Sequence, residues 1–217
     1  MKRRRFRPET PSAENPPPEQ AADEPREAVG LRIVGGKMRG RTLTYSGDLR
    51  TRPMKDRVRE AVFNLIGPRV VGSHAVDLFA GTGALGLEAI SRGAAGATFI
   101  ERHHPTTKLI EQNAAKLGIG GQVAVLFADT FFWAREPQLP ADRPWLVFCS
   151  PPYEFYVSRA DDMLALLGRL HAAAPAESVF VVEADERFAF GQLPQPATWD
   201  IRTYPPAVVG ILAKTAS

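Results

Sequence analysis

The stretch AVDLFAGTGALGLEAI, residues 75–90, decides the fold that we expect for this chain. It opens with an apolar run, typical of a buried strand, that contains Asp77. The glycines at 81, 83 and 86 permit a sharp turn and a close approach to a ligand, and apolar residues at helical spacing follow them. A helix that begins here presents free N–H groups to that ligand. The stretch therefore predicts a strand, a loop and a helix that bind a nucleotide-like cofactor.

The spacing to the next strand makes this interpretation more specific, because a glycine turn also occurs in α/β proteins for geometry alone. The sequence GATFIE, residues 96–101, is typical of a strand and ends in Glu101, about 20 residues beyond the glycine loop. In dinucleotide-binding folds a carboxylate at this position accepts hydrogen bonds from ribose hydroxyls. We expect Glu101 to bind a ribose; the alternative is that it only ends a strand in solvent.

Composition limits the class of protein. The chain has 217 residues, of which 44% are hydrophobic, enough for one sizeable core. Its single cysteine, Cys149, excludes an intrachain disulfide and favours a reducing compartment. No apolar segment fits a signal peptide or a membrane span. We expect a cytoplasmic protein with no membrane partner, and a monomer, because no apolar stripe is left over for a second subunit.

The N-terminal region differs in composition from the rest. Residues 1–28 hold six prolines, six basic and six acidic residues, which predicts a disordered tail. From residue 31 to residue 59 nine basic residues accompany only two acidic ones. Such a concentration of positive charge favours a polyanion such as nucleic acid; the alternative is a solvated face near an acidic ligand. The basic residues are Arg32, Lys37, Arg39, Arg41, Arg50, Arg52, Lys55, Arg57 and Arg59.

Within this region we expect a basic β-ribbon at residues 29–50, with two short strands around a glycine turn. Arg39 and Arg41 share one face of the ribbon because side chains alternate along a strand. The apolar residues at 58–66 then follow helical spacing. The outward side of this helix is expected to carry the cations Arg52, Lys55 and Arg59.

The remaining chain alternates between strand and helix patterns. This alternation predicts an α/β fold with a Rossmann-like, mostly parallel sheet and helices on both faces. Residues 199–204 and 207–212 predict two strands joined by a short proline connection, hence an antiparallel C-terminal hairpin. We expect one main domain over residues 51–217, whose further strands are 122–127, 144–149 and 178–182 and whose further helices are 105–117 and 160–172.

Several predicted strands end in a polar residue, and the ends of parallel strands meet at one edge of a sheet. Ser150 matters most among them, because Pro151, Pro152 and Tyr153 follow it directly. Prolines fix φ and donate no backbone hydrogen bond, so the carbonyl groups here are rigidly oriented. Tyr153 is then placed to stack on a planar ring. The residues expected at this edge are Asp77, Glu101, Asp129 and Ser150.

At these residues the chain resembles the amino-methyltransferases, which use S-adenosylmethionine and carry a D/N/S-P-P-Y/F motif after the fourth strand. More narrowly, it is similar to the bacterial family of 16S ribosomal RNA guanine-N2-methyltransferases. The resemblance extends from about residue 30 to the end of the chain, and the order and spacing of its motifs are more specific than any one of them. The matching motifs are RIVGG (32–36), RGR (39–41), RP (52–53), DRVRE (56–60), FN (63–64) and DLFAGTGALGLEA (77–89).

The resemblance implies a class I methyltransferase sheet and gives each matched residue a role. Glu101, with Arg102 beside it, would hold the cofactor ribose, and Asp129, with Thr130 beside it, would accept a hydrogen bond from the adenine amino group. The methionine part would lie against Asp77, Phe79, Ala80, Gly81, Thr82, Gly83 and Leu85. The target base would be held by the catalytic residues Ser150, Pro151, Pro152 and Tyr153. Ribosomal RNA or the small ribosomal subunit would contact Arg32, Lys37, Arg39, Arg41, Arg52, Lys55, Arg57 and Arg59.

The implied reaction is a direct displacement that depends chiefly on positioning. It requires no metal, and we find no His, Cys or acidic cluster at ligand spacing. Two places depart from the family pattern: Ser150 stands where an acid is usual, and Met54-Lys55 replaces the small hydroxylated residues expected before Asp56. A hydroxyl accepts a hydrogen bond but brings no negative charge to balance a developing positive amine.

Two alternatives stay open at this stage. The first is an amino-methyltransferase for cytosine-N4 or adenine-N6 in DNA; we rank it lower because no stretch is long enough for a large target-recognition region. The second is a non-catalytic S-adenosylmethionine-binding RNA protein in which Ser150 marks lost activity. The intact Pro-Pro-Tyr sequence and glycine loop argue against it.

Overall fold

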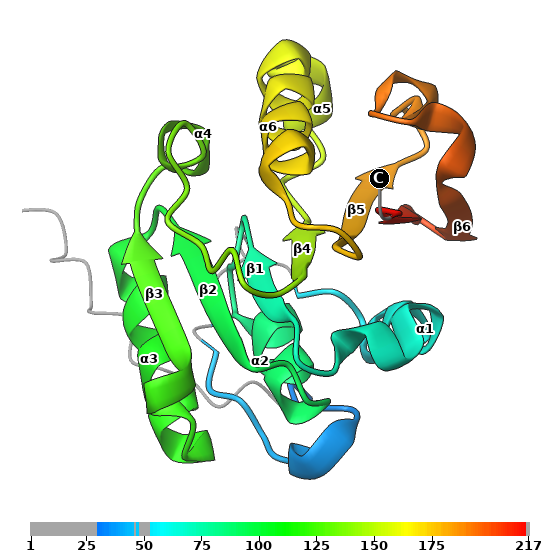
Figure 1. The fold of residues 1–217 in the computed structure, drawn as a ribbon. Helices are drawn as coiled ribbons and strands as arrows, with labels where there is room; N and C mark the ends of the chain where they lie inside the picture. Colours follow the sequence, from blue (N-terminus) through cyan, green and yellow to red (C-terminus); the bar gives the residue numbers. More distant parts are fainter. Residues whose placement is uncertain (1–29, 46, 48–52, 216–217) are drawn as a thin grey trace, which may run out of the picture.

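The structure is a computed structural model that describes residues 30–45, 47 and 53–215. The predicted tail at residues 1–28, and also Arg50 and Arg52, lie outside the described residues. The described part folds around one twisted sheet with helices on both of its faces (Figure 1). No helix within these residues has the length and hydropathy of a membrane span.

Seven strands form the sheet, in the order β3-β2-β1-β4-β5-β7-β6. The first five run parallel, while β7 pairs antiparallel with both β5 and β6. This confirms the predicted mostly parallel sheet with a C-terminal antiparallel hairpin. The strands are β1 (His74–Asp77), β2 (Gly96–Glu101), β3 (Val123–Phe127), β4 (Trp145–Cys149), β5 (Val179–Asp185), β6 (Asp200–Tyr204) and β7 (Ala207–Ala213).

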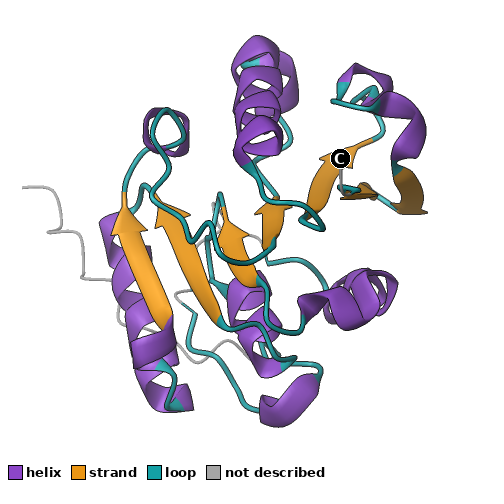
Figure 2. Ribbon diagram, in the orientation of Figure 1, coloured by secondary structure: helices purple, strands orange, loops and turns teal. Residues whose placement is uncertain are grey.

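The helices cover the sheet in two layers (Figure 2). The helices α1, α2 and α3 pack on one face, and α6 packs on the other. Short 3-10 turns lie at Gly36–Met38, Gly67–Val70, Gly120–Gln122, Phe190–Gln192 and Pro196–Thr198. The helices are α1 (Asp56–Ile66), α2 (Ala84–Ser91), α3 (His104–Leu117), α4 (Thr130–Trp133), α5 (Phe155–Ser158) and α6 (Ala160–Ala173).

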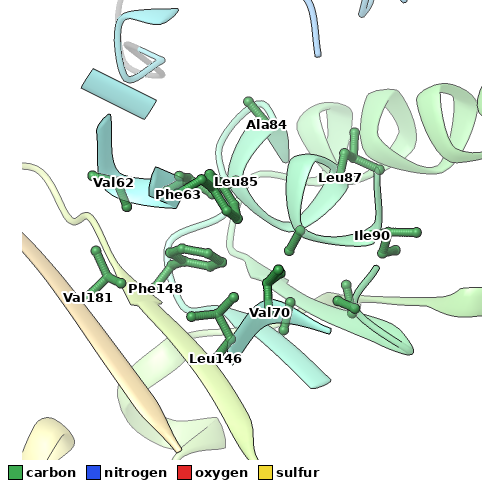
Figure 3. Packing of buried hydrophobic residues seen from close by; sticks show 14 of the residues in the cluster. Val62, Phe63, Val70, Ala84, Leu85, Leu87, Ile90, Leu146, Phe148 and Val181 are labelled. Atoms are coloured by element: carbon green, nitrogen blue, oxygen red, sulfur yellow. The ribbon is translucent and has the colours of Figure 1, made fainter. Parts of the chain in front are cut away.

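The core has two parts because side chains of a strand alternate between the faces of the sheet. Phe148 and Val181 point toward α1 and α2, where the ring of Phe148 lies 5.6 Å from the ring of Phe63 (Figure 3). Their neighbours Val147 and Phe180 point to the opposite face, which α6 covers. Burial on both faces accounts for the nearly continuous apolar runs of the central strands.

The structure describes residues 30–45 and 47 of the predicted N-terminal ribbon. Within these residues the two arms form an antiparallel bridge between Arg32 and Thr42, and a 3-10 turn joins them. The ribbon stays in place because side chains of α2 and α3 bind its backbone. The amide N–H of Val34 donates to Glu88 at 2.7 Å, and Asn113 both accepts from the N–H of Thr44 at 2.7 Å and donates to its carbonyl at 2.9 Å. The ribbon is thus attached to the helical layer of the sheet.

Candidate active site

A cleft of about 660 Å³ opens at the carboxyl ends of the parallel strands, the edge to which the arrowheads of β1, β2 and β4 point (Figure 1). Ligands of open α/β sheets bind at this edge, beside the strand where the sheet order reverses. The loop after β1 and the ends of β2, β4 and β5 line the cleft, together with residues 53–55 and 204–207. The structure brings together there the predicted residues Lys55, Asp77, Phe79, Ala80, Gly81, Thr82, Leu85, Glu101, Arg102, Asp129, Thr130, Ser150, Pro151, Pro152 and Tyr153.

Asp77 ends β1 as a buried carboxylate with an unused acceptor. Its side chain is 1% exposed, and its Oδ2 accepts a hydrogen bond from the N–H of Gly86 at 3.3 Å. Its Oδ1 has no partner among the described residues. Burial raises the pKa of Asp77 to about 8, and the negative charge of Glu101 adds to this effect. A cationic donor that entered the cleft would satisfy Oδ1 and return the carboxyl group to its ionised form.

The three glycines of the loop serve different purposes. Gly81 lines the cleft with φ 49°, a value that residues with a side chain rarely adopt. Gly83, with φ 73°, does not line the cleft and instead precedes the first turn of α2. A Cβ at Gly86 would lie 2.4 Å from the ring of Phe99, so this glycine lets α2 pack directly on β2. The loop is therefore shaped by both ligand access and helix packing.

Glu101 does more than end a strand in solvent. Its Oε2 accepts a hydrogen bond from the N–H of Gly81 at 2.9 Å, and its Oε1 accepts one from the N–H of His103 at 2.8 Å. The side chain thus joins the loop after β1 to the loop after β2. Each carboxylate oxygen keeps a second lone pair, which is available to hydroxyl donors in the cleft.

Three phenylalanine side chains that line the cleft form an aromatic wall. Phe79, Phe131 and Phe155 contact one another with ring centres 5.9 to 6.1 Å apart, and the guanidinium of Arg159 lies 3.7 Å from the ring centre of Phe131. Asp129 begins α4, where its Oδ1 accepts hydrogen bonds from the N–H groups of the next two aromatic residues. Sequence reasoning missed Phe131 and Phe155; an aromatic run directly after Asp129 was the available signal.

The other end of the cleft carries the Ser-Pro-Pro-Tyr sequence. Ser150 follows β4 and is half-buried, and Tyr153 reaches across to the neighbouring strand. The hydroxyl of Tyr153 donates a hydrogen bond to Oε1 of Glu183 on β5 at 2.9 Å. Glu183 also lines the cleft, and sequence reasoning missed it. The signal was an acid directly after the predicted strand 178–182, in the pattern that identified Asp77 and Glu101.

The prediction that Arg59 lies on the outward face of its helix was wrong. Its side chain is 0% exposed, donates to Asp56 at 2.8 Å and to the carbonyl of Arg32 at 2.6 Å, and lies 3.6 Å from Glu88. The physical reason is that Glu88 is buried on α2 and requires cationic partners, which Arg59 and Arg92 supply. Arg59 therefore has no surface to offer to RNA.

The other predicted cations for which the structure gives a position are exposed. Arg32 lies on the surface, where it pairs with Asp56 at 3.1 Å, and Lys55 stands at the cleft itself. Within residues 30–45, 47 and 53–215, His, Cys, Asp and Glu form no group of three or more that could hold a metal ion. The exposed predicted cations are Arg32, Lys37, Arg39, Arg41, Lys55 and Arg57.

The sheet order and the position of the cleft define the class I methyltransferase fold. A solved structure of a putative methyltransferase from Escherichia coli is similar, with a TM-score of 0.69 and 30% identity over 86% of this chain and 99% of that one. An RNA methyltransferase from Salinibacter ruber, solved in complex with S-adenosyl-L-homocysteine, shares the fold with a TM-score of 0.57 and 17% identity over 76% of this chain and 95% of that one.

The chain belongs to the family described as Conserved hypothetical protein 95, whose model matches residues 31–204. Ribosomal RNA small subunit methyltransferase D from Escherichia coli is 40% identical over 123 residues, which are 57% of this chain and 60% of that protein. The protein of the same name from Haemophilus influenzae is 32% identical over 154 residues, 70% of this chain and 77% of that one. These findings confirm the resemblance to the bacterial 16S ribosomal RNA methyltransferase family.

Proposed function

We propose that this protein transfers a methyl group from S-adenosylmethionine to the exocyclic N2 amine of a guanine in 16S ribosomal RNA. One observation carries the proposal: one cleft is lined by the buried carboxylate of Asp77, which has an unpaired oxygen, by the glycine loop and by the Ser-Pro-Pro-Tyr sequence. In such an arrangement a methyl donor and an amine acceptor would lie side by side. The names of the relatives support ribosomal RNA of the small subunit as the substrate.

The residues of the cleft fit this cofactor. Oδ1 of Asp77, a buried acceptor that lacks a partner in the described part of the chain, suits the ammonium group of the methionine part. Glu101 would accept from the ribose hydroxyls with the lone pairs that the loop leaves free. Asp129 would accept from the adenine amino group with Oδ2, since its Oδ1 is engaged by the start of α4. Phe131 offers the adenine an apolar neighbour.

The chain positions the acceptor amine and leaves the bond-breaking to the methyl donor. When bound, S-adenosylmethionine would supply a methyl group on a positively charged sulfur. The amine would attack the methyl carbon, and the sulfur would leave with the C–S electron pair. The Ser150 hydroxyl and the Pro151 carbonyl would accept hydrogen bonds from the amine and orient its lone pair. Tyr153 would stack on the base. Water is kept from the reacting atoms by the apolar walls of the cleft, to which Phe79 and Pro206 contribute.

The exposed cations would bind the phosphate backbone of the RNA. Lys55 lines the cleft, and Arg57 follows on the first turn of α1, so positive charge begins at the cleft. Lys37, Arg39 and Arg41 extend the basic surface over the ribbon, which is held to the helical layer. The positive charge would thus guide an RNA strand toward the target-base end of the cleft, which is the part lined by Ser150 to Tyr153.

The test is methyl transfer from radiolabelled S-adenosylmethionine to small ribosomal subunits and to free 16S RNA, both from cells that lack this protein. Nucleoside mass spectrometry then identifies the product. We expect N2-methylguanosine, and we expect Asp77→Asn to abolish transfer by weakening cofactor binding. Methylation of another base would refute the guanine-N2 assignment, and tight cofactor binding without transfer to any RNA would refute the enzymatic function.

A further inference from the structure

The target-base end of the cleft contains a carboxylate, Glu183, that the mechanism above does not use. Its Oε1 accepts the hydroxyl of Tyr153 at 2.9 Å, and the residue is half-buried in the wall of the cleft. No ion pair between described residues includes Glu183. One oxygen is therefore oriented by the tyrosine and keeps a second lone pair, so both oxygens remain able to accept hydrogen bonds from a ligand.

The strand register places this carboxylate beside Ser150. Cys149, the last residue of β4, pairs with Val182 on the parallel strand β5, and Ser150 and Glu183 are the residues that directly follow this pair. Paired residues of neighbouring strands lie about 5 Å apart, and their side chains point to the same face of the sheet. Both residues line the cleft. Glu183, on the neighbouring strand β5, thus carries the negative charge that Ser150 lacks.

We propose that Glu183 supplies this missing charge and recognises the hydrogen-bonding edge of the target guanine; the inference rests on the function proposed above. Guanine presents two adjacent donors, N1–H and N2–H, which one carboxylate accepts together. Cytosine and adenine place an acceptor nitrogen next to their amine, and a carboxylate repels it. The arrangement selects guanine among the bases that carry an exocyclic amine.

The two hydrogens of the amine then have separate acceptors. The N2 hydrogen nearest N1 binds Glu183, and the other binds the Ser150 hydroxyl or the Pro151 carbonyl. During transfer the nitrogen lone pair forms the new N–C bond, the C–S bond breaks with its electrons on sulfur, and the nitrogen becomes positively charged. Glu183 stabilises that charge, accepts the proton that the nitrogen releases, and returns it to solvent. The products of the reaction are a thioether, a methylated amine and one proton.

The experiment compares wild type with Glu183→Gln and with Glu186→Gln, a control at an exposed acid outside the cleft. Methyl transfer to small subunits lacking the modification gives kcat and KM, and calorimetry gives the affinity for S-adenosylhomocysteine. We expect Glu183→Gln to lower kcat about a hundredfold, as the loss of one preorganised electrostatic group does. Cofactor affinity should stay within about twofold of wild type, because β4 separates the strand of Glu183 from the strand of Asp77.

A base analogue separates recognition from a structural role. Small subunits are reconstituted with 2-aminopurine at the methylated position; this base keeps the C2 amine but has an acceptor at N1. Wild type should prefer guanine strongly, whereas in Glu183→Gln the amide donates to N1 and accepts from the amine, so the preference should shift toward 2-aminopurine. A ratio measured within one variant does not depend on how much of that variant folds.

The outcomes are distinguishable. If wild type forms no N2-methylguanosine, the proposed function fails and this inference fails with it. If wild type is active while Glu183→Gln keeps its kcat and its preference for guanine, only the role of Glu183 is refuted.

Discussion

Cofactor affinity should rise with pH on the acid side of neutrality, because of Asp77. Burial holds its pKa at about 8 in the free protein, so the carboxyl group is mostly protonated at pH 6 to 7. The unpaired Oδ1 can bind the cofactor ammonium strongly only when the group is ionised. Binding must therefore release a proton, and raising the pH must favour binding.

The magnitude follows from the fraction of ionised Asp77. With a pKa of about 8, that fraction is about 1% at pH 6 and about 9% at pH 7. The α-amino group of the ligand, with a pKa near 8, stays largely protonated over this range. The association constant should thus rise about eightfold between pH 6 and pH 7, or about 1.2 kcal/mol. Above pH 8 the gain ends, since Asp77 is then ionised and the ligand begins to lose its own charge.

Isothermal titration calorimetry with S-adenosylhomocysteine at pH 6 and pH 7, in two buffers of different ionisation enthalpy, measures the association constant and the number of protons released on binding. We expect close to one proton released per ligand bound. Asp77→Asn should bind more weakly and lose most of the pH dependence, because its side chain has no proton to release. An equal affinity at both pH values in wild type, with no proton released, would show that Asp77 is already ionised or does not meet the ammonium, and would refute the reasoning.

Three further predictions concern the surroundings of the cleft. Arg59→Met should reduce the free energy of unfolding by about 3 kcal/mol in urea titrations, because it removes a buried cation from its carboxylate partner on α2, whereas the exposed Arg57→Met should change it by less than about 0.5 kcal/mol. Gly86→Ala should lower stability by about 1–3 kcal/mol in thermal denaturation, since its Cβ would overlap the phenylalanine ring on β2; no loss would mean that α2 shifts easily. Replacing Arg39 and Arg41 together by Ala should reduce the salt slope of RNA binding by about 1 to 2 and leave cofactor affinity unchanged, and an unaltered slope would place the RNA elsewhere.

The sequence allowed prediction of those parts of the site that depend on local pattern and sheet geometry. Asp77, Glu101 and Ser150 each end an apolar strand, and parallel strands bring their ends to one edge. No long-range information is needed for that inference. The glycine loop also follows from its own residues, because Gly81 adopts a backbone conformation that other residues avoid.

What could not be predicted depends on contacts between segments that are distant in the sequence. The helical pattern of residues 58–66 leaves Arg59 beside the apolar face, and contacts with the buried Glu88 on another helix and with the carbonyl of Arg32 in the ribbon hold it inward. Glu183 accepts a hydrogen bond from Tyr153, 30 residues earlier in the chain, and this bond joins the turn after β4 to β5. The residue pattern of one segment does not identify the residues that contact it in the folded protein.

The attachment of the ribbon to α2 bears on how this protein can be divided. The N-terminus of α2 adjoins the glycine loop, while Glu88 and Ser91 near its other end bind the backbone of the ribbon at Val34, Gly35 and Met38. A fragment that began at residue 53 would lose these hydrogen bonds and those of Asn113, and it would remove Leu31, Ile33 and Leu43 from the hydrophobic core. Trimming the ribbon would therefore weaken the cofactor half of the protein as well, so a shortened expression fragment should keep residues 30–45.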